Sequence, residues 1–228
     1  MESKMHNGDI RQHLQQLYPD KNIDLIYADE YRDLTINKSL PFKFIYLWMP
    51  DFEDEISTKI YNKAITWLDN LANFKDVQWL YFCGPVGVCK TALASTILKY
   101  AYCILRNKKV RDEYKKKNFI FDEQNLIKFW SSYDLVKDFI NNAGEFVFNK
   151  QAYVLVLDDI TKPSNDFYSE VLDSVLRYRE LNCLPTIMTS QVNTERLSDV
   201  FALPLCDLIK GNCDEVVITG DSKRRNNG

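Results

Sequence analysis

The sequence predicts an α/β protein built around a parallel β-sheet. Short apolar runs of strand length alternate along the chain with longer segments that have helical periodicity. The runs are nearly uncharged, which is typical of strands buried on both faces of a sheet. A glycine-containing turn joins one run directly to a helical segment. This alternation favours parallel crossovers and a three-layer arrangement with helices on both faces of the sheet.

The strands and helices can be placed in chain order from these patterns. Strands are predicted in five places: 77–83, within 119–130, 152–159, 185–190 and 214–220. A helix is expected from Glu53 onward because apolar residues recur there at helical spacing: Ile56, Ile60, Ala64, Trp67, Leu68 and Leu71. Further helices are expected over 90–105, after Ser131 or Ser132 as the cap, over 166–181, and briefly from Thr194.

Composition limits the class of protein. The chain has 228 residues, 46% of them hydrophobic, which is enough for one compact domain with a short extension. Its net charge of -3 gives no sign of a strongly basic surface that coats nucleic acid. The six cysteines lack the paired spacing of a zinc site and are expected to be reduced thiols. With no apolar run long enough for a membrane span and no signal-peptide pattern, a cytoplasmic protein is expected.

Residues 1–50 differ from the rest and are predicted to form a short N-terminal extension, with residues 51–228 as the main domain. Asp9 can cap a short helix whose apolar side carries Ile10, Leu14 and Leu17. The aromatic stretch 40–50, "LPFKFIYLWMP", follows. It is interpreted either as a strand or arm packed on the main domain or as a docking surface for a partner protein.

The stretch "YFCGPVGVCKTALAS", residues 81–95, carries the clearest chemical motif. A phosphate-binding loop has the pattern G-x-x-x-x-G-K-[ST] between a buried strand and a helix. Gly84, Lys90 and Thr91 match, whereas Cys89 replaces the second diagnostic glycine. A glycine turn can also simply connect a strand to a helix without binding a ligand. The residues predicted to cradle a nucleotide are Gly84, Pro85, Val86, Gly87, Val88, Cys89, Lys90 and Thr91.

A second acidic motif supports the nucleotide interpretation. The strand "YVLVLDD" ends in Asp158 and Asp159, about 65 residues after the loop. In nucleotide-binding proteins of this kind, one such carboxylate and the loop hydroxyl lie in the coordination shell of Mg²⁺. We therefore predict Thr91 and Asp158 as the magnesium residues.

From about residue 50 onward, the chain resembles the ATPase domain of bacterial helicase loaders of the DnaC and DnaI type, within the AAA+ superfamily, and also the transposition helper ATPase IstB. The resemblance rests on four segments in family order: "LYFCGPVGVCKTALAS", "YVLVLDDI", "LRYRELNCLPTIMTSQV" and "VVITGDSKRR". It implies a P-loop NTPase fold of the AAA+ (ASCE) type with five parallel strands ordered 5-1-4-3-2. ATP and Mg²⁺ would bind above the loop, at the carboxyl ends of the strands.

The resemblance also implies catalytic roles. Asp159 stands where many relatives have a glutamate that activates water, and it is one methylene shorter. Gln191 replaces the polar sensor residue, usually asparagine, and keeps an amide that can contact the terminal phosphate or the water. Arg224, with Arg225 as the alternate, aligns with the sensor arginine of the last motif.

The clearest departure from the family lies between Arg196 and Gly211. Relatives have an arginine there that reaches the ATP of the neighbouring subunit, and a second one four residues later. The aligned residues in this chain are Pro204 and Leu208. Because such an arginine contributes about 10³ to 10⁵ in rate where it operates, ATP turnover is expected to be weak or lost. Arg196 lies too far upstream to replace it.

The leading hypothesis is an ATP-binding AAA+ protein of DNA replication that engages a replicative hexameric helicase and assists its loading on single-stranded DNA. The compact length and the altered motifs suggest a phage or mobile-element version. One alternative is a non-hydrolysing interaction protein that serves as a platform or inhibitor of a helicase or loader, and another is a transposition helper ATPase. Single-stranded DNA and further copies of the chain are additional candidate partners. The basic run 106–118 is the best candidate for DNA contact, although such runs are usually solvated.

Overall fold

A computed structural model describes residues 40, 55–73, 75–116, 126–141, 152–161 and 166–220 of the chain. Its centre is a five-stranded parallel sheet with the strand order β2-β3-β4-β1-β5. The strands are β1 (Trp79–Cys83), β2 (Ile127–Ser131), β3 (Val154–Asp158), β4 (Thr186–Ser190) and β5 (Cys213–Val217). Read from the other edge, this order is 5-1-4-3-2, which confirms the predicted fold class.

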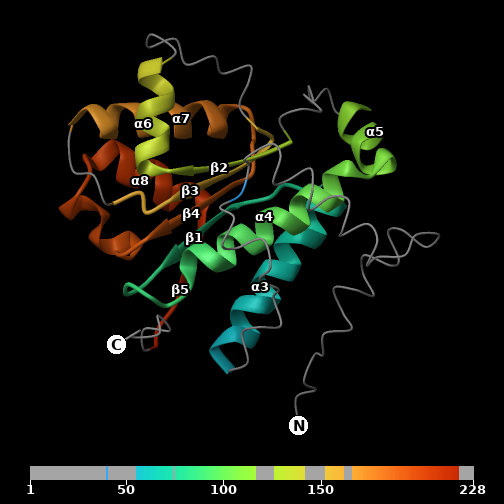
Figure 1. The fold of residues 1–228 in the computed structure, drawn as a ribbon, viewed down its shortest axis with the longest axis horizontal. Coiled ribbons are helices and arrows are strands. Elements are labelled where there is room, and N and C mark those ends of the chain that lie inside the picture. The colour runs from blue at the N-terminus through green and yellow to red at the C-terminus, as the bar shows by residue number, and fades with distance from the viewer. Residues whose placement is uncertain are drawn as a thin grey trace.

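Helices cover both faces of the sheet, so the molecule has three layers (Figure 1). Helices α3 and α4 lie on one face, and α6, α7 and α8 lie on the other, with α5 beyond the end of α4. The helices are α3 (Glu55–Ala72), α4 (Lys90–Arg106), α5 (Lys108–Lys116), α6 (Ser132–Asn141), α7 (Asp166–Leu181) and α8 (Leu203–Asn212), with a 3-10 helix, η4 (Thr194–Asp199).

The buried strands supply alternate side chains to the two layers. In β1, Leu80 and Phe82 belong to the apolar cluster under α3 and α4, whereas Tyr81 and Cys83 belong to the cluster under α7 and α8. Successive side chains of a strand point to opposite faces, so a strand buried on both sides must be apolar throughout. This is the reason the apolar run in the sequence located β1 correctly.

Two helices differ from what the sequence patterns indicated. Most of the basic run 106–118 forms a helix of its own, α5, whose lysines are exposed and whose buried contacts are Val110 and Tyr114, four residues apart. Helix α8 was not predicted, because Pro204 and Gly211 interrupt its apolar pattern. The proline lies in the first turn of α8, where no intrahelical N–H is required.

Arg179 of α7 is fully buried and ties the amino-terminal ends of two strands together. Its guanidinium donates to Thr186 Oγ1 at 2.7 Å and to three backbone carbonyl oxygens, those of Ala152 (3.0 Å), Tyr153 (2.9 Å) and Pro185 (2.6 Å). Burial lowers the pKa of Arg179 to about 9, so the side chain is still charged at neutral pH. Arg179, the second arginine of the "LRYRELNC" segment, therefore holds β3 and β4 together at the amino-terminal ends of the strands.

The predictions on the N-terminal extension, including the helix after Asp9 and the aromatic arm through Trp48, lie outside the described residues. Leu40 is the exception: its side chain is 7% exposed and belongs to the apolar cluster under α3 and α4. In the part of the chain that the structure describes, no helix has the length and apolarity to cross a bilayer.

Candidate functional site

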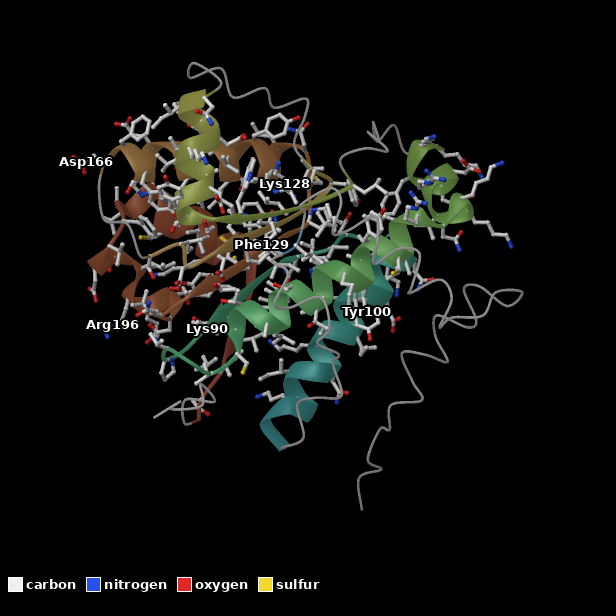
Figure 2. All side chains as sticks on the ribbon, in the orientation of Figure 1. Lys90, Tyr100, Lys128, Phe129, Asp166 and Arg196 are labelled. Carbon is white, nitrogen blue, oxygen red and sulfur yellow. The ribbon has the colours of Figure 1, made fainter. Side chains whose placement is uncertain are left out.

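The loop between β1 and α4 wraps around the ammonium group of Lys90. Lys90 lies at the start of α4 (Figure 2), and its Nζ donates to the carbonyl oxygens of Gly84 at 2.8 Å and Pro85 at 2.7 Å. The side chain is 7% exposed, so the charge lies inside the loop rather than in bulk solvent. A positive charge enclosed by a loop at a helix N-terminus is suited to binding an anion.

Gly84 is required by the packing of the loop against β5. Its φ is +149°, and a Cβ at this position would lie 2.0 Å from the carbonyl oxygen of Ile218. The chain after β5 runs close because the Ile218 N–H donates to the carbonyl oxygen of Cys83 at 2.7 Å. Gly87 also has a positive φ, +91°. Both glycines of the loop thus occupy backbone conformations that favour glycine.

Cys89 occupies a left-handed conformation, with φ 65° and ψ 19°, immediately before α4. A side chain other than glycine in this region costs roughly 1–2 kcal/mol. The residue still begins the helix, because its carbonyl oxygen accepts from the Leu93 N–H at 2.9 Å. The loop therefore keeps the backbone path that a glycine would take, and it does so with a strained cysteine.

Thr91 and Asp158 meet across the space between α4 and β3. The Thr91 hydroxyl donates to Asp158 Oδ1 at 2.8 Å, and the same oxygen accepts from the Thr189 hydroxyl at 2.6 Å. A hydroxyl and a carboxylate are the oxygen ligands that Mg²⁺ prefers. The two residues predicted for magnesium are thus in contact, although they are 67 positions apart in the sequence.

Thr189 is a site residue that sequence reasoning missed. It lies in β4 and is fully buried. Besides donating to Asp158, its hydroxyl accepts from the Asp159 N–H at 2.9 Å. A threonine inside an apolar strand looks like an ordinary β-branched strand residue, and only its position opposite the acidic end of β3 could have marked it.

Asp159 follows β3 in a left-handed conformation, with φ 56°. Aspartate tolerates this conformation better than most residues. The buried Tyr168 of α7 lies close enough to sense its charge: burial and, secondarily, the charge of Asp159 raise the pKa of Tyr168. Asp159 therefore lies at the carboxyl edge of the sheet, beside the pair Thr91 and Asp158.

Of the other predicted catalytic residues, Gln191 is described and Arg224 is not. Gln191 is exposed and follows β4 directly. Because Ser190 pairs with Cys83 across β4 and β1, Gln191 lies at the same edge of the sheet as Gly84. Arg224 and its alternate Arg225 lie outside the described residues.

The two positions that the resemblance aligns with arginines take different places in α8. Pro204 is exposed at the first turn of the helix, whereas Leu208 is 7% exposed and belongs to the apolar core under α7 and α8. The exposed Arg196 donates to Asp199 Oδ2 at 3.0 Å. Neither Pro204 nor Leu208 can supply positive charge, and Leu208 is turned into the core.

The site contains few protein ligands for a metal on its own. Within the described ranges, no group of three or more His, Cys, Asp or Glu side chains is arranged to hold a metal ion. Mg²⁺ in nucleotide sites typically uses one or two protein oxygens and completes its shell with phosphate oxygens and water. Thr91 and Asp158 fit this kind of site.

Comparisons with known proteins define the fold class. No protein-family model matches the chain, and no curated protein matches its sequence. Among solved structures, the fold matches AAA+ P-loop NTPases. The crystal structure of the DnaC helicase loader has a TM-score of 0.59 and 20% identity, over 78% of this chain and 100% of the other.

Two further structures show the same fold. DnaI has a TM-score of 0.57 and 20% identity, over 81% of this chain and 94% of its own. AMPPCP-bound DnaA from Aquifex aeolicus has a TM-score of 0.58 and 19% identity over 82% of this chain. The present chain spans about half, 53%, of that DnaA chain. The protein thus has the AAA+ fold found in the DnaC and DnaI loaders and in DnaA.

Proposed function

We propose that this protein binds ATP with Mg²⁺ and acts in DNA replication by engaging a replicative hexameric helicase and assisting its loading on single-stranded DNA. The observation that carries the proposal is the contact between Thr91 and Asp158 beside the enclosed ammonium of Lys90. The helicase role is supported by the similarity to DnaC and DnaI over 100% and 94% of those chains.

Each residue of the site has a distinct task in this proposal. The loop N–H groups from Gly84 onward and the Lys90 ammonium hold the phosphates. Thr91 and Asp158 hold Mg²⁺, and Thr189 keeps the Asp158 carboxylate oriented through its 2.6 Å hydrogen bond. Bound Mg²⁺-ATP supplies a terminal phosphoryl group whose charge the metal partly neutralises.

Turnover is proposed to be slow compared with binding. Asp159 orients the attacking water, but its side chain is one methylene shorter than glutamate and its backbone is already constrained by Thr189. Gln191 contacts the terminal phosphate or the water through its amide, and Arg224 is the proposed sensor arginine. With Pro204 and Leu208 in place of arginines, the negative charge that develops on the phosphoryl group is stabilised only weakly.

Equilibrium binding of ATP, with and without Mg²⁺, tests the nucleotide site. Lys90→Ala is expected to weaken ATP binding by roughly 100-fold, because charged hydrogen bonds to phosphate contribute about 1.5–3 kcal/mol each. Lys108→Ala removes an exposed lysine of α5 and is the matched control, with unchanged affinity. Wild-type protein that fails to bind ATP at millimolar concentration would contradict the proposal.

The alternative is a platform that keeps the fold and binds the helicase without ATP turnover. The burial of Leu208 and the strained Cys89 favour it, because both weaken the catalytic arrangement. Helicase association measured for wild type and Lys90→Ala separates the two. Equal association without ATP turnover supports the platform, whereas association and turnover that both fall support the loader.

The extension 1–50 is proposed as the helicase-docking arm of the AAA+ domain 51–228. Deletion of residues 1–39 removes the segment predicted to form a helix with Ile10, Leu14 and Leu17 but spares the buried Leu40. Trp48→Ala tests the aromatic arm separately. We expect at least one of these changes to abolish helicase binding while ATP binding is kept. Helicase binding that survives both would place the docking surface on the AAA+ domain.

Contact with single-stranded DNA is proposed for α5. Its exposed side carries Lys108, Lys109, Lys115 and Lys116, although Lys116 also pairs with Glu113. Replacing Lys109 and Lys115 by alanine should weaken DNA binding and make its salt dependence less steep. Lys137→Ala, an exposed lysine of α6 on the other face of the sheet, is the control. Equal losses in both variants would contradict a specific role for α5.

A further inference from the structure

The segment that carries Gln191, residues 190–194, is fixed by the hydroxyl of Tyr81. Tyr81 lies in β1, is fully buried, and donates to the carbonyl oxygen of Val192 at 2.9 Å. The N–H of Val192 donates in turn to Ser190 Oγ at 3.0 Å. Burial raises the pKa of Tyr81, so its hydroxyl remains a donor. The peptide groups on the C-terminal side of Gln191 are therefore held from β1.

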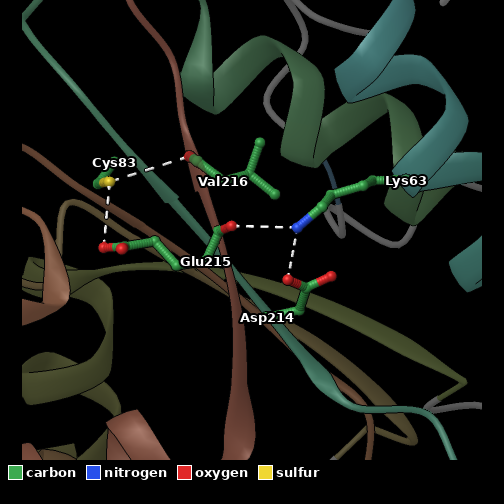
Figure 3. A network of polar contacts seen from close by, with 5 residues as sticks. All are labelled: Lys63, Cys83, Asp214, Glu215 and Val216. Atoms are coloured by element: carbon green, nitrogen blue, oxygen red, sulfur yellow. Dashed lines mark hydrogen bonds and ion pairs between the residues drawn. The ribbon is translucent and has the colours of Figure 1, made fainter.

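The same segment is held again from β5. Glu215 Oε1 accepts from the Thr194 N–H at 2.6 Å and from the Cys83 thiol at 3.5 Å. Burial and the neighbouring Glu215 raise the pKa of Cys83 to about 12, so the thiol stays protonated. Lys63 fixes this stretch of β5 through the Glu215 carbonyl oxygen at 3.2 Å and through an ion pair with Asp214 (Figure 3).

A third contact links the segment to the acidic end of β3. The hydroxyls of Thr161 and Ser190 are 3.1 Å apart and share a hydrogen bond. Thr161 comes shortly after Asp158 and Asp159. The residues before and after Gln191 are thus tied to β1, to β5 and to the chain that follows β3. A surface loop that only connects a strand to a helix does not need to be held by this many hydrogen bonds.

We propose that Tyr81 and Glu215 are positioning residues that hold Gln191 toward the terminal phosphate of ATP. The inference rests on the proposed function, since it assigns Gln191 a contact with that phosphate. Neither residue needs to touch the nucleotide, because both fix the backbone that follows the exposed Gln191. A polar side chain that is already held in place binds a ligand with a matching hydrogen-bonding group more tightly than a ligand without that group.

The ratio of ATP affinity to ADP affinity is the direct measurement, because ADP lacks the terminal phosphate. Tyr81→Phe removes one hydroxyl and is expected to lower the preference for ATP roughly three- to tenfold while ADP affinity is unchanged. Gln191→Ala should have the same effect, and the double variant should add little to it. Glu215→Gln should act in the same direction.

Tyr114→Phe is the matched control for Tyr81→Phe. Tyr114 is 3% exposed and also donates to a backbone carbonyl oxygen, that of Leu71 at 2.6 Å, but at the opposite edge of the sheet. It should lower stability similarly and leave the ATP preference unchanged. If Tyr81 had only a structural role, Tyr81→Phe and Tyr114→Phe would have the same ratio of ATP affinity to ADP affinity.

Hydrogen exchange without nucleotide separates this inference from the proposed function. The amides of Val192 and Thr194 should exchange faster in Tyr81→Phe than in wild type, and Tyr114→Phe should not change them. Unchanged exchange and an unchanged ATP preference in Tyr81→Phe would overturn the positioning role while nucleotide binding stands. Wild-type protein that binds neither nucleotide would contradict the proposed function itself and, with it, this role for Gln191.

Discussion

The two edges of the sheet each contain a buried cation, and they use it differently. At the amino edge, Arg179 donates hydrogen bonds to Thr186 and to three backbone carbonyl oxygens. These bonds join the starts of β3 and β4. At the carboxyl edge, Lys90 donates to two carbonyl oxygens of its own loop. The first arrangement links distant segments of the fold, whereas the second keeps a charge inside a local loop, where a competing anion can engage it.

Each edge also contains a cysteine in the left-handed region. Cys89 has φ 65° in the loop before α4, and Cys183 has φ 50° in the turn after α7. The turn at Cys183 closes α7, with its N–H donating to Glu180 O at 3.0 Å and the next N–H to Arg179 O at 2.8 Å. Similar strain therefore occurs in a helix end at one edge and, at the other, in the loop proposed to bind phosphate.

This contrast teaches that burial and strain do not mark function by themselves. At the amino edge, Arg179 is held mainly by backbone carbonyl oxygens. At the carboxyl edge, the side chains of Thr91, Asp158 and Thr189 are hydrogen-bonded to one another. Side chains that are hydrogen-bonded to one another can exchange these bonds for bonds to a ligand. This property distinguishes a binding site from a network that only stabilises the fold.

The largest effect is expected at the amino edge. Arg179→Met should lower the free energy of unfolding by about 3–5 kcal/mol, because it leaves buried carbonyl oxygens without a donor. Arg177→Ala, on the exposed side of the same helix, removes only a surface ion pair with Asp173 and should change stability by less than about 0.5 kcal/mol. Urea unfolding measures both. A loss below about 1 kcal/mol for Arg179→Met would show that its hydrogen bonds are not needed.

An intermediate effect is expected for Asp158→Asn. We expect ATP affinity in Mg²⁺ to fall roughly tenfold, to the level without metal, because an amide binds Mg²⁺ more weakly than a carboxylate. Affinity in a chelator should be unchanged. Asp173→Asn, an acid of α7 far from the loop, is the control for loss of charge. A fall of equal size in chelator would mean that Asp158 acts on the loop rather than on the metal.

The smallest effect is expected from the two left-handed cysteines. Cys89→Gly and Cys183→Gly should each stabilise the fold by up to about 1 kcal/mol, since relief of strain is partly offset by the entropy of glycine in the unfolded chain. Only Cys89→Gly should also raise ATP affinity, by a few-fold. Isothermal calorimetry on both variants measures this difference. Equal affinities would mean that the loop already accommodates the thiol.

The sequence predicted the parts of the fold that depend on local pattern. The strand at 79–83 was located because every residue in it is buried, so the apolar run is uninterrupted. The strand order came from the family resemblance and not from periodicity. Helix α5 was missed because only Val110 and Tyr114 interrupt its charged residues.

The candidate site was predicted where a motif marks it and missed where only tertiary contact does. Lys90, Thr91 and Asp158 stand in recognisable spacing, and the structure brings the last two into contact. Thr189, Tyr81 and Glu215 lie inside strands, and their partners are distant in the sequence. Strand register decides which of them face the acidic end of β3 or the segment of Gln191, and a strand buried on both faces has no apolar–polar alternation that would reveal its register.

The central claim is that the carboxyl edge binds nucleotide while the amino edge only holds the fold together. The most direct test is the rise in melting temperature that Mg²⁺-ATP produces in wild type, Lys90→Ala and Arg179→Met. At about 100 times the dissociation constant, ATP should add about 2.7 kcal/mol, or roughly 5–10 °C. We predict that Arg179→Met melts lower but keeps this rise, whereas Lys90→Ala melts like wild type and loses it. A full rise in Lys90→Ala would contradict the account.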